Sequence, residues 1–484
     1  MDQHFTQQEW EACIKVLKAL SRVPELSPDN DTLKGLVTKL YKRAKKERKL
    51  EMREMTAEQP VANTQLLPLR KIQQIARRQA AIRQYNNTVL AQTALHRNYE
   101  QPADKHMAEA EAALLQLAGL QKCYTCGSSY KDVHFFYHLL CPTCAALNFD
   151  KRQQRCDLQD RIALVTGGRI KIGYLTALKL LRDGAKVWVT TRFANDCAMR
   201  FAQEPDAARW LHRLRIVPVD FRNPGQLQHF IHQLQEQEPY LDIIINNAAQ
   251  TVRRPAAFYR HLFDAEQLPV NALPAPVRDC MVHDAVLCFK PAAWEQKLLP
   301  GDMEQFFPKH AYDKDRQQID LRPENSWTQL LQDISPMEML ETQLVNVTAP
   351  FMLNSQLKPM LLRSPYERKF IVNVSAMEGQ FNRDSKTPYH PHTNMAKAAL
   401  NMMTRTSAQE YAQQNIFMNS VDTGWITQEN PHPKKEKVHA SGFVPPLDET
   451  DGMARIYDPV ATGINSPELP LFGHFLKNYL PHAW

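Results

Sequence analysis

The chain has 484 residues, of which 43% are hydrophobic and 23% charged, and its formal net charge at pH 7 is +7. Residues 1–150 hold 21 Lys and Arg against 16 Asp and Glu, so the basic character belongs to the N-terminal part. The length suits two or three domains. No apolar run reaches the roughly 20 residues of a membrane helix, and the start lacks the layout of a secretion signal. We therefore expect a cytoplasmic protein without a membrane segment.

Residues 1–118 are predicted to form a basic helical region. They are rich in Gln, Ala, Leu, Lys and Arg, and apolar residues recur at helical spacing, as at Leu36, Leu40 and Ala44. The segment Lys39–Arg53 holds eight basic and two acidic residues. A solvated helix face or linker is the ordinary interpretation of such a charge run, and nucleic-acid binding is the weaker alternative.

Residues 119–150 are predicted to form a small zinc-ribbon-like module. Two Cys-x-x-Cys pairs lie 14 residues apart, a spacing that suits four thiolate ligands of one zinc ion. Such a site has no open position for water, so it stabilises a fold and does not catalyse. Together with the helical region, the module is a candidate surface for a protein partner. The expected ligands are Cys123, Cys126, Cys141 and Cys144.

Residues 156–484 alternate short β-rich apolar runs with helical patterns, which predicts an α/β domain with a doubly wound parallel sheet of Rossmann type. An insertion at about 253–336 is rich in Pro and aromatic residues, and we expect it to form an ordered cap. The expected strands are 162–165, 187–190, 216–219, 243–245, 370–374 and 416–421, and the expected helices are 174–182, 226–237, 341–353 and 396–413.

The first strand leads into a glycine-containing turn, Thr166–Gly173, and then a helix, which presents backbone N–H groups to a pyrophosphate. The turn resembles the Thr-Gly-x-x-x-Gly-x-Gly turn of the short-chain dehydrogenase/reductase family, and Asn246–Ala249 resembles the Asn-Asn-Ala-Gly motif of that family. This resemblance extends from about residue 160 to the C-terminus apart from the insertion. One departure is Lys171, which replaces the middle glycine and either crowds the phosphate site or contacts the phosphates itself.

The resemblance also implies a nicotinamide coenzyme. The second strand ends in Thr191-Arg192 without the carboxylate that would bind the ribose of NAD, which favours NADP(H), with NAD(H) as the alternative. The residues that the resemblance assigns to coenzyme binding are Thr166, Gly167, Gly168, Arg169, Lys171, Ile172, Gly173, Arg192, Asp220, Asn247, Ala248, Lys397, Gly424 and Thr427.

The catalytic positions of the family are altered in this chain. The family uses a Tyr as general acid or base, a Lys four residues later and a Ser, whereas here Thr393 stands at the Tyr position and Lys397 is kept. The best alignment places Ala376 at the Ser position, although a shift of one residue restores Ser375.

Other candidate residues adjoin these positions. Asn346 occupies the position of the active-site Asn of the family. His392 is the best candidate for a replacement acid because it adjoins Thr393, and Tyr389, His390 and Glu378 are alternatives.

Two functions follow from these motifs. The first is an NADP(H)-dependent oxidoreductase of the short-chain type with a non-standard active site, acting on a small carbonyl or alcohol substrate. The second is a catalytically inactive coenzyme-binding regulator or scaffold that acts through its zinc and helical regions, since losing the acid removes on the order of 10²–10⁴ in rate. The resemblance further implies a homodimer or homotetramer.

Overall fold

The computed structural model describes residues 6–20, 116–268, 270–284, 286–287, 305–313, 315–382, 386–427, 429–440 and 443–484. The chain divides into two units, Met1–Gln65 and Leu66–Trp484. In the first unit the described part is helix α1 (Gln7–Leu20), which falls within the predicted helical region. The basic segment Lys39–Arg53 lies outside the described residues.

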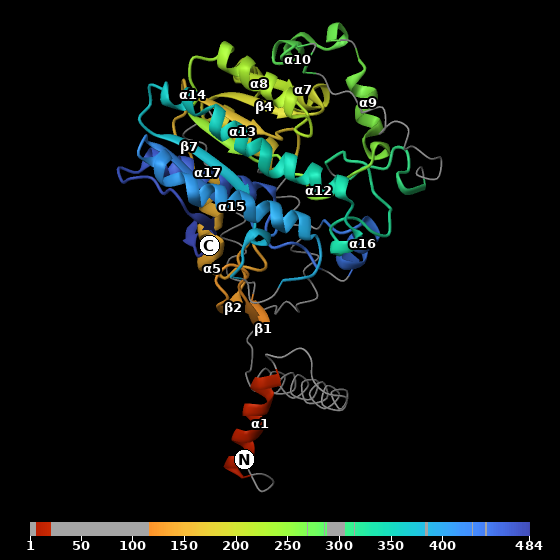
Figure 1. Cartoon of the computed structure of the whole chain (residues 1–484), viewed down its shortest axis with the longest axis vertical. Helices are drawn as coiled ribbons and strands as arrows, with labels where there is room; N and C mark the ends of the chain where they lie inside the picture. The colour runs from red at the N-terminus through yellow and green to blue at the C-terminus, as the bar shows by residue number, and fades with distance from the viewer. Residues whose placement is uncertain are drawn as a thin grey trace. The chain divides into compact units, whose positions relative to one another are not determined.

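A mostly parallel eight-stranded sheet forms the centre of the second unit (Figure 1). Its strand order is β10-β9-β8-β7-β6-β3-β4-β5, and β10 is antiparallel to β9. The order reverses between β3 and β6, as in a doubly wound fold, so the predicted fold class is confirmed. The strands are β3 (Ile162–Thr166), β4 (Lys186–Thr191), β5 (Leu214–Pro218), β6 (Ile243–Asn246), β7 (Lys369–Ser375), β8 (Ile416–Asp422), β9 (Phe475–Lys477) and β10 (Leu480–His482).

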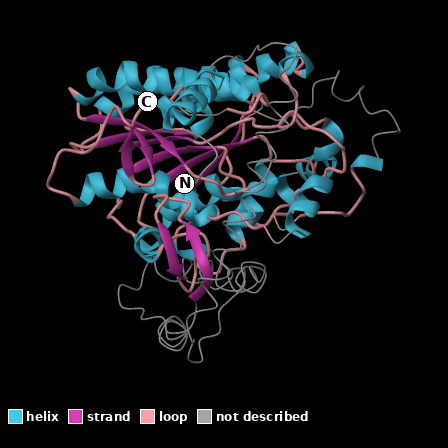
Figure 2. Ribbon diagram, turned by 90° about the horizontal axis from the view of Figure 1, so that it is seen from below, coloured by secondary structure: helices cyan, strands magenta, loops and turns pink. Residues whose placement is uncertain are grey.

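Helices cover both faces of this sheet (Figure 2). One core packs α6, α7 and α17 against the sheet, and the other packs α8, α13, α14 and α15 against the opposite face. Burial on both sides explains why the strands are continuous apolar runs. The helices are α6 (Lys171–Arg182), α7 (Ala194–Ala202), α8 (Pro224–Gln237), α12 (Pro336–Gln343), α13 (Ala349–Gln356), α14 (Lys358–Leu362), α15 (Pro391–Ala412), α16 (His432–Ala440) and α17 (Glu449–Asn465).

Two helices differ most from their predicted form. The expected helix 341–353 is divided, because a π-helical turn at Leu344–Thr348 separates α12 from α13. Helix α15 begins at Pro391, before the predicted start at 396, because a proline fits the first helical position, where no N–H partner is needed.

The cysteine module consists of an antiparallel hairpin, β1 (Gln116–Lys122) and β2 (Ser129–Asp132), followed by helix α5 (Pro142–Gln153). The sequence predicts that the module ends at residue 150, whereas α5 continues to Gln153. Two basic residues in its last turn, Lys151 and Arg152, favour the helix C-terminus.

The described part of the insertion is folded against the sheet domain. It contains α9 (Arg260–Glu266), α10 (Ala275–Asp279) and the short 3-10 turns Ala256–Tyr259, Val270–Ala272 and Leu331–Asp333. Met281 forms a parallel bridge with Ile216, which extends the sheet beyond β5. Phe258 and Phe307 form a small apolar core of their own.

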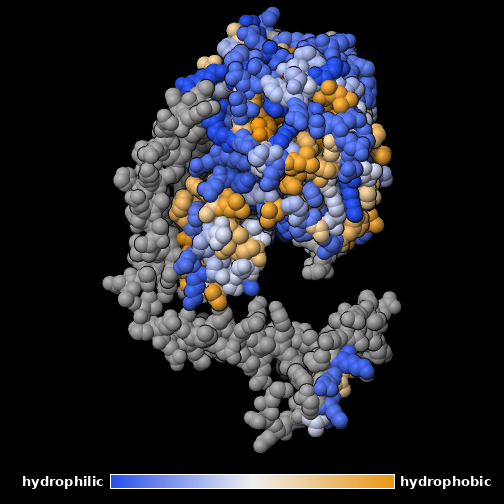
Figure 3. Space-filling view, turned by 90° about the vertical axis from the view of Figure 1, so that its left-hand side faces the viewer, coloured by the Kyte–Doolittle hydropathy of each residue, from blue (hydrophilic) through white to orange (hydrophobic). Residues whose placement is uncertain are grey.

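The surface drawn in Figure 3 is largely hydrophilic, with apolar side chains in small groups. Of the helices that the structure describes, none combines the length and the apolar character needed to cross a bilayer.

Candidate functional site

The predicted phosphate turn is tied to the Asn-Asn-Ala-Ala segment at the point where the strand order reverses. Thr166 Oγ1 accepts hydrogen bonds from the backbone N–H of Asn247 (3.0 Å) and Ala248 (2.9 Å). Asn247 Nδ2 donates to the carbonyl of Gly167 (3.2 Å). A Cβ on Gly173 would lie 2.3 Å from Asn247 Nδ2, so this close approach requires glycine. The crevice at such a reversal is where α/β sheets bind ligands.

Lys171 keeps the backbone conformation that suits the glycine it replaces, with a φ of 54°. A left-handed residue with a side chain is strained by roughly 1–2 kcal/mol. The carboxylate of Glu429 is the main cause of the raised pKa of Lys171. Burial raises the pKa of Glu429, but Lys171 and Lys435 outweigh it and lower that pKa to about 2. The two residues therefore stabilise each other as a charged pair.

The two arginines among the predicted coenzyme-binding residues have different surroundings. Arg169 is buried, and its guanidinium donates to Asp196 (2.7 Å) and to Gln317 of the insertion (2.8 Å). Arg192 lies over the ring of Tyr259, 4.5 Å from its centroid. The insertion thus contacts both arginines, and Arg192 is half-buried.

Asp220 follows β5, on the same edge of the sheet as Arg192. Burial raises its pKa, whereas hydrogen bonds from Arg222 and the charge of Arg192 lower it, with a net lowering. The carboxylate is therefore ionised at neutral pH.

Three further coenzyme candidates lie at the ends of β7 and β8. Lys397 is buried on α15, and its Nζ donates to the carbonyl of Val374 at 2.7 Å. Burial lowers the pKa of Lys397 to about 8. Gly424 has a φ of 80°, and Thr427 Oγ1 donates to Glu429 (2.9 Å).

The structure brings Thr393, His392 and Glu338 together. All three side chains are buried. His392 Nε2 lies 3.5 Å from Thr393 Oγ1 and 3.6 Å from Glu338 Oε1. His392 Nδ1 has no hydrogen-bond partner among the described residues. Burial raises the pKa of Glu338, but its hydrogen bonds with His392 and Ser326 lower it, and the net shift is downward.

Ser375 and Asn346 each have hydrogen-bond partners within the described residues. Ser375 Oγ donates to Asn401 on α15 at 2.6 Å. The side chain of Asn346 accepts from the N–H of Gln250 (2.7 Å) and donates to its carbonyl (3.2 Å). Asn346 thereby ties the π-helical turn to the chain that follows the Asn-Asn-Ala-Ala segment.

The alternative acids are placed less favourably than His392. Tyr389 is 41% exposed on the loop before α15. His390 stacks on Trp327 with a centroid separation of 3.9 Å, and its Nδ1 lies 2.9 Å from the carbonyl of Trp327. Burial lowers the pKa of His390. These contacts with Trp327, a residue of the insertion, hold the His390 side chain in place.

The four predicted zinc ligands lie together, with all their sulfur atoms within 4.8 Å of one another. Cys126 Sγ and Cys141 Sγ are 3.8 Å apart. A tetrahedral zinc site with Zn–S bonds of ~2.3 Å requires a sulfur separation of about 3.8 Å, so the donor set fits zinc. His134 packs among Phe135 and Phe149 and is outside the sulfur cluster.

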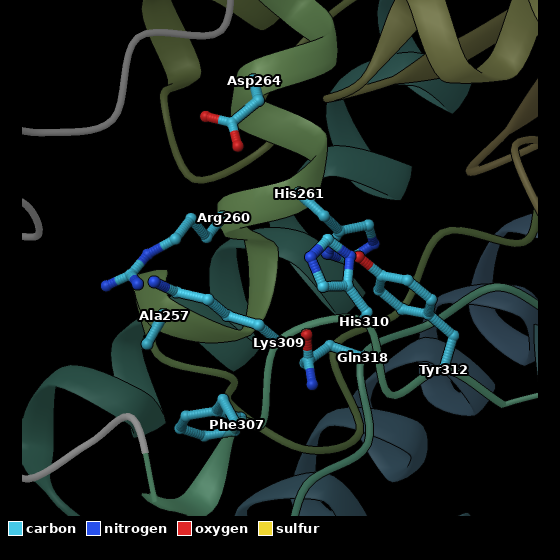
Figure 4. Close-up of a pocket in the computed structure, with 9 residues that line it drawn as sticks. All are labelled: Ala257, Arg260, His261, Asp264, Phe307, Lys309, His310, Tyr312 and Gln318. Atoms are coloured by element: carbon cyan, nitrogen blue, oxygen red, sulfur yellow. The ribbon is translucent and has the colours of Figure 1, made fainter.

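A pocket of about 140 Å³ lies within the insertion (Figure 4). Arg260 and Lys309 line one side of it, and His261, His310 and Tyr312 the other. None of the residues assigned to the coenzyme or the active site lines this pocket.

Two residues of the site carried no signal in the sequence. Glu338 follows the N-cap Ser335 of α12 and looks like an ordinary first-turn acidic residue, yet it reaches His392. Tyr124 lies between two cysteines of the module, and its hydroxyl accepts from the N–H of Trp425, 301 residues away. Both contacts exist only because distant segments meet in the folded chain.

Known proteins resemble this chain in its sheet domain. The family model described as "short chain dehydrogenase" matches residues 161–266, and the one described as "Enoyl-(Acyl carrier protein) reductase" matches 324–441. An uncharacterized protein of Acanthamoeba polyphaga mimivirus is 29% identical over 360 residues, which are 72% of each chain.

Other matches are shorter or more distant. A rhamnolipids biosynthesis 3-oxoacyl-[acyl-carrier-protein] reductase of Pseudomonas aeruginosa is 36% identical over 94 residues, which are 19% of this chain and 34% of that protein. A short-chain dehydrogenase from Burkholderia cenocepacia, solved with NADP, is 19% identical with a TM-score of 0.43, covering 66% of this chain and 97% of that one. The two family models match on either side of the insertion and in chain order, so over residues 161–266 and 324–441 the sheet domain is similar to the short-chain dehydrogenase/reductase family.

Proposed function

We propose that the protein is an NADP(H)-dependent oxidoreductase that acts on a small carbonyl or alcohol and uses His392 in place of the missing tyrosine. The observation that carries this proposal is the buried series Thr393, His392 and Glu338, one helical turn from Lys397. A buried histidine with a carboxylate beside it is a common arrangement for a general acid or base.

The proposed roles divide the reaction among these residues. A bound nicotinamide coenzyme supplies or accepts the hydride. His392 transfers the proton to or from the substrate oxygen, with Thr393 as the hydroxyl between them. Glu338 orients the imidazole. The distances of 3.5 and 3.6 Å are long, and catalytic hydrogen bonds often shorten when substrate binds.

The preference for NADP(H) rests on Arg192. It stands at the end of β4 where an NAD-binding chain carries a carboxylate. Tyr259 contacts its guanidinium, with Cζ 4.5 Å from the ring centroid, and this contact helps to hold the side chain beside the end of β4. The same proposal assigns Lys171 to the pyrophosphate.

We also propose that Cys123, Cys126, Cys141 and Cys144 bind a structural zinc ion. The sulfur separations fit this ion, and four thiolates leave it no open position for a reaction.

The second candidate function is a regulator that binds the coenzyme without turnover. Ser375 favours it, because the hydroxyl of this residue is already bonded to Asn401 and is not directed to a substrate. Because the tyrosine is also absent, neither member of the family's Ser and Tyr pair directs a hydroxyl to a substrate.

The experiment that separates the two functions measures binding and turnover on the same zinc-loaded preparation. Calorimetry gives the affinity for NADPH and NADH, and loss of NADPH absorbance against a carbonyl panel gives turnover. If His392 is the acid, His392→Ala lowers kcat by about 10²–10⁴-fold with coenzyme affinity kept, whereas Tyr389→Phe, on the exposed loop, stays at the wild-type rate. Tight NADPH binding without turnover on every substrate supports the regulator instead.

A further inference from the structure

The cysteine module packs against two segments that are assigned to the coenzyme, the phosphate turn and the segment after β8. Its core contains Tyr130, Phe136 and Tyr137, and in the same cluster lie Ile426 and Leu447 from the segment after β8. Ile172, the residue before Gly173 in the phosphate turn, packs on this cluster too. The module is therefore part of the wall of the coenzyme site as well as a separate metal-binding fold.

Tyr124 makes a specific polar contact between the module and the segment after β8. Its hydroxyl accepts a hydrogen bond from the backbone N–H of Trp425 at 2.8 Å. The neighbouring Gly424 is so close that a Cβ there would lie 3.6 Å from the same hydroxyl. Because Tyr124 stands between Cys123 and Cys126, a metal that fixes these two cysteines also fixes the backbone of the tyrosine.

The other end of the segment is anchored by α5 of the module. Arg152 is buried and donates to Asp448 (2.7 and 3.1 Å) and to Asp451 (2.9 Å). Tyr137 also donates to Asp451. These two carboxylates form the capping box of α17, so the module holds the start of that helix.

We propose that the zinc module positions the coenzyme site, and that Tyr124 is a positioning residue for segment 424–427, which contains the coenzyme candidates Gly424 and Thr427. With zinc bound, the module holds this segment at Trp425 and the following chain at Asp448. Loss of zinc releases Tyr124 and weakens coenzyme binding, although none of the four cysteines is among the residues assigned to the coenzyme. This inference rests on the proposed function in one respect, namely that a nicotinamide coenzyme is the ligand.

The first test is Tyr124→Phe in the full chain, with Tyr130→Phe as the matched control. The Tyr130 hydroxyl donates to the carbonyl of His138 (2.8 Å) inside the module. Removing this hydroxyl therefore tests whether the loss of any tyrosine hydrogen bond in the module changes the coenzyme site. We expect Tyr124→Phe to keep its zinc, to exchange the amide hydrogen of Trp425 faster and to raise the Kd for NADPH about 3- to 10-fold, the contribution of one neutral hydrogen bond. Tyr130→Phe should leave Trp425 exchange and the Kd near wild type. Wild-type exchange at Trp425 in Tyr124→Phe, or an equal Kd, overturns the inference.

The second test removes zinc from the wild-type chain with a chelator and measures hydrogen exchange before any coenzyme is added. Segments 424–427 and 443–448 should lose protection, the Kd for NADPH should rise more than about 10-fold, and added Zn²⁺ should reverse both effects. If the zinc-loaded protein binds no nicotinamide coenzyme, the proposed function fails, and the exchange data still report on the positioning role. Unchanged exchange after complete zinc removal overturns that role whatever the coenzyme result.

Discussion

Replacing Lys397 with methionine should stabilise the coenzyme-free protein at neutral pH while it weakens coenzyme binding. Burial lowers the pKa of Lys397 to about 8 from 10.5. Below pH 8 the folded and unfolded forms both carry the proton, so the buried ammonium destabilises the fold by about 3 kcal/mol. Between pH 8 and 10.5 the folded form loses its proton first, and this destabilisation fades as the pH rises. The destabilisation of the fold by Lys397 is therefore absent only above pH 10.5.

The net gain at pH 7 is smaller than that figure. Methionine leaves the Val374 carbonyl without the hydrogen bond from Lys397, and an unsatisfied buried acceptor costs about 1–3 kcal/mol. The difference in unfolding free energy between Lys397→Met and wild type should thus be small and positive at pH 7. It should fall by about 2.5 kcal/mol between pH 7 and pH 10 and become negative.

Urea unfolding of both proteins at several pH values measures this difference, and titration with NADPH measures binding. The comparison cancels the other groups that titrate in this range, because both proteins share them. A difference that does not change between pH 7 and pH 10 would refute the reasoning, since it would mean that Lys397 keeps an ordinary pKa. Gain of stability together with loss of coenzyme affinity is the expected mark of a residue kept for binding.

Two further substitutions test the contacts around the site. Gly173→Ala should abolish coenzyme binding, because the new Cβ would lie 2.3 Å from Asn247 Nδ2. The control Gly225→Ala, at the start of α8, should bind coenzyme normally. Calorimetry measures both affinities, and equal values would contradict the role of the turn. Arg152→Met should lower the unfolding free energy by about 3–5 kcal/mol, because it leaves Asp448 buried without its cation. A thermal melt close to that of wild type would show that the Arg152–Asp448 ion pair does not stabilise the fold.

The sequence alone was sufficient for six strands of the central sheet, β3 to β8, and for the phosphate turn. Apolar runs such as Ile243–Asn246 are continuous because both faces of each central strand are covered, and that pattern needs no partner to be recognised. The Thr166–Gly173 turn can be recognised locally because its glycines lie close together in the chain, although the contacts that require them are made to Val189, Asn247 and Ala248. The short strands β9 and β10 were missed because three residues are too few to show a period.

The identities of Thr393, Lys397 and the four cysteines, and with them the altered chemistry, can be read from the chain without any coordinates. Tertiary structure alone decided which groups surround them. Glu338 comes to His392, and Tyr124 to Trp425, across long stretches of chain, and periodicity and spacing carry no information about such meetings. The physical reason is that a pattern in sequence reports which face of an element is buried, whereas the partner on that face is selected by the packing of the whole domain.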